Sequence, residues 1–150
     1  MQIINSQLIE EIVKKVIAEQ MGSEFKDSNR HIDPSGIMSV KAKNIKAEPF
    51  DTGKEGDKVG LTDLFSLNES PRIGAGVMEL DKTTFEWTLN YDEIDYIIEG
   101  TLEILIYGRK VVGKAGDVIL IPKGSKIQFS TPDFTRFLYV VYPANWAEQA

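Results

Sequence analysis

The chain has 150 residues, of which 42% are hydrophobic and 27% are charged. This composition is typical of one soluble globular domain, and the length is sufficient to bury a core. The net charge of −6 argues against a nucleic-acid partner, because an acidic surface repels phosphate. The absence of cysteine excludes disulfides and thiolate metal sites. The sequence has no run of about 20 apolar residues and no signal-peptide pattern, so we expect a cytoplasmic protein without a membrane partner.

An amphipathic helix is predicted over residues 1–22. Ser6 is a suitable N-cap and Gly22 a suitable stop. Between them, apolar residues recur at the spacing of one helix face: Leu8, Ile9, Ile12, Val13, Val16 and Ile17. This apolar stripe has two uses that the sequence leaves open. It can pack on the chain's own domain or on a second copy, or it can dock into a groove of another protein.

Residues 23–36 are rich in polar residues, glycine and proline, a composition typical of a linker. They contain the single histidine of the sequence, His31, which we expect to be a solvated loop residue. A site built from several histidines is excluded by this count.

From residue 37 to residue 150 the pattern changes to short β-type runs separated by turn residues. The runs follow one another at spacings of about 8–12 residues, which indicates an antiparallel sandwich or barrel. They are GAGVMEL, TTFEWTL, EIDYIIE, TLEILIYG, KVVG, DVILIP, KIQFS and TRFLYVVYP. Tight hairpin connections are predicted at Gly100 and at Gly108, because glycine supplies the backbone freedom that such turns need.

One stretch resembles the first signature of the cupin fold. In WTLNYDEIDYIIEG, Glu93 and Gly100 have the spacing of the signature's glutamate and closing glycine. The two histidine positions of the signature fall on Trp87 and Leu89. Residues two apart on a strand point the same way, so these positions would face one interior.

A second stretch, GDVILIPKGSKI, resembles the second cupin signature at Gly116, Pro122 and Gly124. Its histidine position falls on Ile127. The two signatures together imply an all-β, cupin-type antiparallel barrel (a double-stranded β-helix, or jelly roll) with an N-terminal helix. Tryptophan, leucine and isoleucine cannot ligate a metal ion, whereas transition metals favour imidazole. We therefore expect no metal ligands and no tightly bound cofactor, with these three side chains filling the barrel.

Longer strings resemble one family in particular. VGLTDLF, WTLNYDEID, AGDVILIPKGS and FLYVVYPANW are similar to the C-terminal cupin domain of the ethanolamine-utilisation protein EutQ family. The resemblance implies association with the bacterial microcompartments that process ethanolamine, with shell proteins or enzymes as partners. It also implies a homodimer and an acetate kinase activity, in which ATP, with Mg²⁺ in the substrate complex, and acetate give acetyl phosphate and ADP.

Three neighbours in the first signature are the candidate catalytic residues: Tyr91, Glu93 and Asp95. They share one face of a regular strand. Two carboxylates and a phenol inside an apolar barrel would have shifted pKa values, which are typical of functional sites. They could share Mg²⁺ or act as an acid/base pair. The alternative is that a bulge near Asn90–Asp92 turns one of them to solvent and that Asp95 is a rim residue.

Five further residues are expected to line the pocket: Trp87, Leu89, Ile127, Arg136 and Tyr139. A guanidinium on the apolar strand of Arg136 needs an anionic partner, and the acidic cluster is one candidate. The aromatic residues of the C-terminal YPANW are expected to close the barrel or to line a subunit interface. The sequence has no GxxxxGK[S/T] phosphate loop, and PKGSK is interpreted as the cupin turn. Lys123 and Lys126 in this turn are the candidates for phosphate contacts, or they are ordinary surface lysines.

Two functions therefore stay open. The first is an acetate kinase that uses an acidic interior pocket. The second is a non-catalytic small-ligand-binding or assembly protein of the ethanolamine microcompartment. The clustered polar residues favour the first, and the missing phosphate loop and histidines favour the second.

Overall fold

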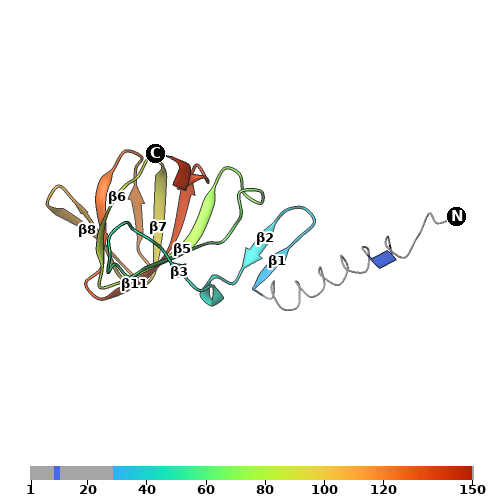
Figure 1. Cartoon of the computed structure of the whole chain (residues 1–150), viewed down its shortest axis with the longest axis horizontal. Helices are drawn as coiled ribbons and strands as arrows, with labels where there is room; N and C mark the ends of the chain where they lie inside the picture. The colour runs from blue at the N-terminus through green and yellow to red at the C-terminus, as the bar shows by residue number, and fades with distance from the viewer. Residues whose placement is uncertain (1–8, 11–28, 150) are drawn as a thin grey trace. The chain divides into compact units, whose positions relative to one another are not determined.

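The computed structural model describes residues 9–10 and 29–149, and it divides the chain into two units, Met1–Asn44 and Ile45–Ala150 (Figure 1). The helix predicted over residues 1–22 lies outside the described residues, except for two positions near 10 that have helical backbone. Within the described part of the chain, no helix is long and apolar enough to cross a membrane.

The described part of the first unit contains a small β-hairpin. Strand β1 (Arg30–Ile32) pairs in antiparallel fashion with β2 (Met38–Val40), and a 3-10 turn, η2 (Ala42–Asn44), follows. β1 lies within residues 23–36, which the composition had indicated as a linker. His31 is exposed, and it belongs to this strand rather than to a loop.

The second unit is a curled antiparallel sheet (Figure 1). Its strands are β3 (Glu48–Pro49), β4 (Val59–Asp63), β5 (Gly74–Asp81), β6 (Thr84–Thr88), β7 (Asp92–Ile106), β8 (Arg109–Lys114), β9 (Val118–Ile121), β10 (Lys126–Ser130) and β11 (Phe134–Tyr142), and the 3-10 turn η3 (Trp146–Glu148) follows. Neighbouring strands lie in the order β3-β4-β5-β11-β7-β10-β6, and β8 and β9 each pair with β7. This arrangement confirms the predicted all-β barrel.

Strand β7 is shared between the two halves of the barrel. Its first half pairs with β11 and β9, and its second half pairs with β10 and β8. Gly100 lies between the halves with φ of 75°. The pairing with β11 is irregular at the same place. The hairpin predicted at Gly100 is therefore wrong, because the freedom of glycine serves a bend inside one long strand. The turn predicted at Gly108 is confirmed, since it links β7 to β8.

The bend in β7 changes which positions face the interior. Glu93, Asp95 and Ile97 are buried in the first half, and Leu102 and Ile104 are buried in the second. Side chains of a regular strand alternate between its faces, so the change from odd to even positions requires an extra residue at the bend. One strand thus supplies both polar and apolar side chains to the same interior.

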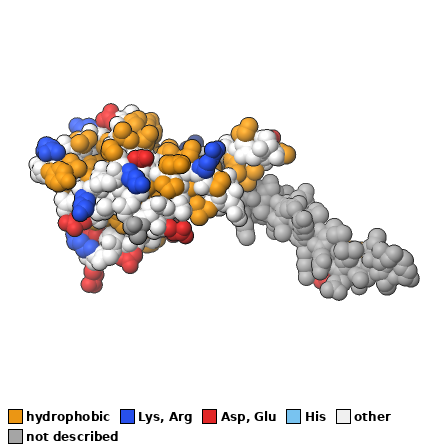
Figure 2. Space-filling model, turned by 90° about the horizontal axis from the view of Figure 1, so that it is seen from above, with side chains coloured by type: hydrophobic (Ala, Val, Ile, Leu, Met, Phe, Trp, Pro, Cys, Tyr) orange, Lys and Arg blue, Asp and Glu red, His pale blue; other side chains and the backbone are white. Residues whose placement is uncertain are grey.

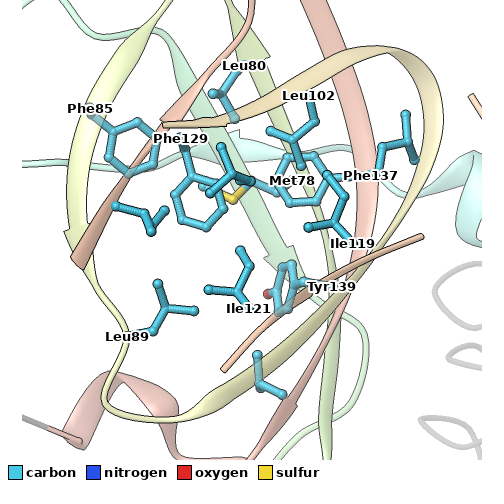
Figure 3. Close-up of a cluster of buried hydrophobic side chains, with 14 of the residues drawn as sticks. Met78, Leu80, Phe85, Leu89, Leu102, Ile119, Ile121, Phe129, Phe137 and Tyr139 are labelled. Atoms are coloured by element: carbon cyan, nitrogen blue, oxygen red, sulfur yellow. The ribbon is translucent and has the colours of Figure 1, made fainter. Parts of the chain in front are cut away.

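Aliphatic and aromatic side chains from facing strands fill most of this interior (Figure 3). Phe129 stacks on Phe85 and on Phe137, with ring centroids 5.4 and 6.1 Å apart. Leu80 and Leu102 are fully buried beside them. Burial of apolar surface contributes about 25 cal/mol per Å², so this row is a major source of stability.

Gly100→Ala is expected to lower the free energy of unfolding more than Gly108→Ala does. Both glycines have φ of 75°, so each alanine carries left-handed strain of roughly 1 kcal/mol. At Gly100 the added Cβ would also lie 1.9 Å from the backbone oxygen of Phe134, whereas nothing lies within 4 Å at Gly108. Urea unfolding of both variants should show an extra loss of about 2 kcal/mol at Gly100. Equal losses would contradict the close approach.

Candidate functional site

Two carboxyl side chains lie next to each other on the inner face of β7. Glu93 is 5% exposed and Asp95 is fully buried. Tyr91, just before β7, and Tyr139 on β11 are buried as well, and Tyr139 is the cross-strand partner of Asp95. The face formed by Tyr91, Glu93 and Asp95 is therefore directed into the barrel. Asp95 is not a rim residue.

Three oxygens of the carboxyl pair have no hydrogen-bond partner in the described part of the chain. Glu93 Oε2 and both carboxyl oxygens of Asp95 are buried without a hydrogen-bond partner. Two ionised carboxylates can only accept hydrogen bonds, so the contact between them becomes a hydrogen bond when one carries a proton. The observed geometry is therefore satisfied by a protonated pair.

Burial shifts the titration of both acids upward. Loss of solvent raises the pKa of Glu93 to about 7, although the hydrogen bond with Asp95 acts in the opposite direction. Loss of solvent, followed by the charge of Glu93, raises the pKa of Asp95 well above its usual range. At neutral pH the pair therefore holds at least one proton.

Two phenols flank the carboxyl pair. Trp87 Nε1 donates a hydrogen bond to Tyr91 Oη at 2.7 Å, and Tyr139 Oη donates to Asp63 Oδ1 on β4. Burial raises the pKa of both phenols, and the charge of Glu93 adds to this for Tyr91. Both phenols stay protonated at neutral pH. Because Tyr91 Oη accepts from the indole, its own proton remains available for donation.

A small cavity adjoins these polar groups. Its volume is about 20 Å³, about the room that one water molecule needs. Most of its lining is aromatic or aliphatic: Phe50, Leu61, Met78, Phe85, Trp87, Tyr91, Glu93, Phe129, Tyr139, Val141 and Trp146. The cavity is therefore a small and mostly apolar space, in which a carboxyl group has at most one neighbouring water molecule.

Trp146 of η3 packs against the other aromatic side chains that line the cavity. Its ring centroid lies 6.2 Å from that of Trp87, 5.9 Å from that of Tyr91 and 6.4 Å from that of Tyr139. It also packs on Phe50 at 6.3 Å. The indole of Trp146 therefore forms part of the cavity wall.

Three of the predicted pocket residues do not line the cavity. Leu89 and Ile127 are buried in the apolar core instead. Arg136 lies on the other side of β11 from Tyr139, because alternate residues of a strand face opposite sides. Its Nη1 lies 2.7 Å from Oε2 of Glu79 on β5, so its acidic partner is not the carboxyl pair.

The two lysines predicted to contact phosphate lie away from the cavity lining as well. Both are exposed. The backbone N–H of Lys123 donates to Asp92 Oδ1 at 2.8 Å, and Lys126 lines a surface groove together with Arg109 and Lys110.

Two contributors were not identified from the sequence as members of the site. Asp63 gave no signal of its own, because its partner Tyr139 is 76 residues away along the chain. Trp146 was noted only as one of the C-terminal aromatics. Within the described ranges, no cluster of three or more histidine, cysteine, aspartate or glutamate side chains is arranged to hold a metal ion.

The curled sheet is similar to solved cupins. A cupin superfamily protein from Desulfitobacterium hafniense is 18% identical, with a TM-score of 0.54, over 68% of this chain and 86% of that chain. The likeness at this identity concerns the fold alone. The class is therefore a cupin-type barrel, here with Trp87, Leu89 and Ile127 at the signature's histidine positions.

The chain belongs to the ethanolamine utilisation protein EutQ family, whose family model matches residues 4–148. A relative from Clostridioides difficile (strain 630), named acetate kinase EutQ, is 53% identical over 151 residues, which cover 97% of this chain and 96% of the relative. A relative of the same name from Salmonella typhimurium is 41% identical over 141 residues. This match covers 94% of the chain but spans 61% of the relative's length. The solved structure of Clostridium difficile EutQ matches with a TM-score of 0.79 and 58% identity, over 81% of this chain and 90% of that chain.

Stability is expected to fall as pH rises through the titration of Glu93. Its pKa is 4.5 without burial and about 7 in the folded chain. Between these values the folded chain keeps a proton that the unfolded chain has lost, so the free energy of unfolding decreases with rising pH. At about 1.4 kcal/mol per pKa unit, the full loss is on the order of 3 kcal/mol. The glutamine of Glu93→Gln is neutral at every pH, so this variant should lack the part of the loss that comes from Glu93.

Urea unfolding at about pH 5 and about pH 8 measures this linkage. The loss between the two pH values should be smaller in Glu93→Gln than in the wild type. Glu86→Gln changes an exposed carboxyl on β6 and should leave the loss unaltered. Parallel pH dependence in Glu93→Gln and the wild type would show that Glu93 does not titrate as stated.

Proposed function

We propose that this protein is an acetate kinase of the ethanolamine microcompartment and that the protonated Glu93–Asp95 pair holds the acetate. The observation that carries the proposal is a buried acid pair with raised pKa values beside an apolar cavity. The relatives named acetate kinase EutQ support it.

The proposed reaction needs no general base. Acetate is already an anion at neutral pH, and one of its oxygens attacks the γ-phosphorus of ATP. The bond from that phosphorus to the β–γ bridging oxygen breaks, ADP leaves, and acetyl phosphate forms. The protein's task is then to hold one acetate oxygen while the other stays free to attack.

A protonated carboxyl can perform this task in an acidic site. Two ionised carboxylates would repel acetate, whereas a neutral Glu93 or Asp95 donates an O–H to it. The free O–H of Tyr91 is a second donor. The apolar lining excludes water, which strengthens both hydrogen bonds.

ATP, as its Mg²⁺ complex, is the second substrate, and a cavity of about 20 Å³ cannot contain it. We place the meeting of the two substrates beside Trp146, and we propose that displacement of this indole makes room for them. Lys123 and Lys126 remain our candidates for contacts to the phosphates. Lys126 has Arg109 and Lys110 beside it in the surface groove.

Glu93→Ala should raise the KM for acetate about tenfold or more, because it removes a buried hydrogen-bond donor. Glu93→Gln keeps an N–H donor, so its KM should stay within about threefold of the wild-type value. The wild-type KM should rise above about pH 7, as the Glu93 proton is lost, and the glutamine variant should lack this rise. The rate of acetyl phosphate formation at varied acetate concentration gives the KM of both variants and the pH dependence of the wild-type KM.

The matched control for these variants is Glu55→Gln, whose carboxyl is exposed in the loop between β3 and β4 and should not affect the KM. Equal loss of activity in Glu93→Gln and Glu93→Ala would indicate that the carboxylate itself, and not a donor, is required. Wild-type kinetics in both would remove Glu93 from the site.

Trp146→Ala should widen the range of accepted acids. Removing the indole enlarges the space next to Glu93, so the ratio of kcat/KM for propionate to that for acetate is expected to rise about tenfold. Trp146→Phe keeps an aromatic ring over the cavity and should change the ratio little. An unchanged ratio in Trp146→Ala would show that substrate enters elsewhere.

The second candidate function is a non-catalytic ligand-binding or assembly protein of the same microcompartment. The small volume of the cavity, about 20 Å³, and the absence of a phosphate loop from the sequence favour it. In that case the purified chain would form no acetyl phosphate, yet calorimetry would still detect acetate binding that Glu93→Ala abolishes. Residues 1–22 are then the candidate segment for docking onto shell proteins or enzymes.

A further inference from the structure

A surface groove with a volume of about 510 Å³ lies between β6, β10 and the β7–β8 hairpin. Small-molecule sites commonly have volumes of about 300–1,000 Å³. Three cationic side chains line the groove: Arg109, Lys110 and Lys126. Figure 2 shows Lys and Arg side chains next to hydrophobic ones at the end of the second unit where Figure 1 labels β8. We call this space, with the three cations around it, the basic groove.

The cations of the basic groove outnumber the acids around them. Glu86 is the acidic residue of its lining, and Lys110 Nζ lies 3.5 Å from Oε2 of Glu103. In the described part of the chain, Arg109 and Lys126 form no ion pair with a carboxylate. The whole chain carries a net charge of −6, so this local excess of positive charge runs against the average. Such an excess favours an anionic ligand.

An aromatic side chain at the edge of the basic groove is held in a strained conformation. Tyr107 and Gly108 form the two-residue turn between β7 and β8, and their φ angles are 48° and 75°. Turns of this kind favour glycine, asparagine and aspartate, which adopt positive φ most readily. Tyr107 is 79% exposed, so packing on this unit does not offset the strain. Arg109 Cζ lies 5.9 Å from the centre of its ring, a cation–π contact. A strained and exposed ring beside cations is suited to stacking on a planar group of a ligand.

The indole of Trp87 connects the basic groove with the interior. Trp87 lines the groove, and it also lines the cavity that adjoins Glu93. On β6 it is the cross-strand partner of Ile127, the residue after Lys126. An anion held by Lys126 therefore lies next to the side chain that borders the cavity.

We propose that the basic groove binds a nucleoside triphosphate, with the base stacked on Tyr107 and the phosphates among Arg109, Lys110 and Lys126. A base offers a planar face to the phenol ring, and a triphosphate offers the negative charge that the cations attract. The terminal phosphate then lies nearest to Lys126 and Trp87. The choice of ATP as the nucleotide rests on the proposed acetate kinase activity, whereas the contacts to base and phosphates follow from the groove itself.

Calorimetric titration of the full chain with Mg²⁺–ATP and with inorganic tripolyphosphate, both without acetate, tests the proposal. Tyr107→Asn suits the turn but lacks the ring, so it should weaken ATP binding at least about tenfold and leave tripolyphosphate binding within about twofold. Tyr107→Phe keeps the ring and should bind ATP like the wild type. Lys126→Ala should weaken both ligands at least about tenfold. Lys114→Ala removes an exposed lysine at the other end of β8 and is the matched control, with no change expected.

Three results would overturn the proposal: no ATP binding by the wild type at about 1 mM ligand, ATP binding that Tyr107→Asn leaves unaltered, or equal weakening by Lys126→Ala and Lys114→Ala. Steady-state kinetics separates this proposal from the acetate kinase proposal. ATP binding with the expected variant effects but without acetyl phosphate formation would refute the kinase and support the groove. Acetyl phosphate formation with an unchanged KM for ATP in Tyr107→Asn and Lys126→Ala would refute the groove and leave the kinase in place.

Discussion

Strand β7 pairs with four other strands, and it can do so because its backbone bends at Gly100. The bend takes the strand from one half of the barrel to the other. It also lets residues on both sides of the bend face the same interior. The backbone of Phe134 approaches Gly100 so closely that a side chain has no room there. The bend therefore brings the carboxyl side chains of the first half of β7 and the apolar side chains of its second half to one interior.

One of the residues at the signature's histidine positions lies beside the buried acids. Trp87, Leu89 and Ile127 occupy the positions that carry imidazoles in the cupin signatures, and they bring no charge or metal to the interior. Of these three, Trp87 lines the cavity beside Glu93, and desolvation is the main reason that Glu93 and Asp95 hold a proton. Trp87 contributes twice, because its indole also orients Tyr91.

Local patterns in the sequence predicted the barrel, its turn at Gly108 and the shared face of Tyr91, Glu93 and Asp95, because a strand has a period of two. The patterns failed where the deciding contact was distant. Glycine indicates backbone freedom but does not distinguish a turn from a bend, so a hairpin was wrongly predicted at Gly100. The partner of Arg136 lies 57 residues away, and no local signal distinguishes it from the acidic cluster. The roles of Asp63 and Trp146 likewise depend on packing between remote segments.

The two sides of the first half of β7 have opposite chemistry at consecutive positions. The inward residues Glu93 and Asp95 are acids, and the outward residues Ile94 and Tyr96 are large and apolar. Inserting or deleting one residue between Asp92 and Gly100 would exchange the two sets, placing Ile94 and Tyr96 inside and the carboxyls on the surface. Single substitutions in this segment alter one side at a time, whereas a change in its length damages both. We therefore expect descendants of this sequence to vary in the composition of the segment long before they vary in its number of residues.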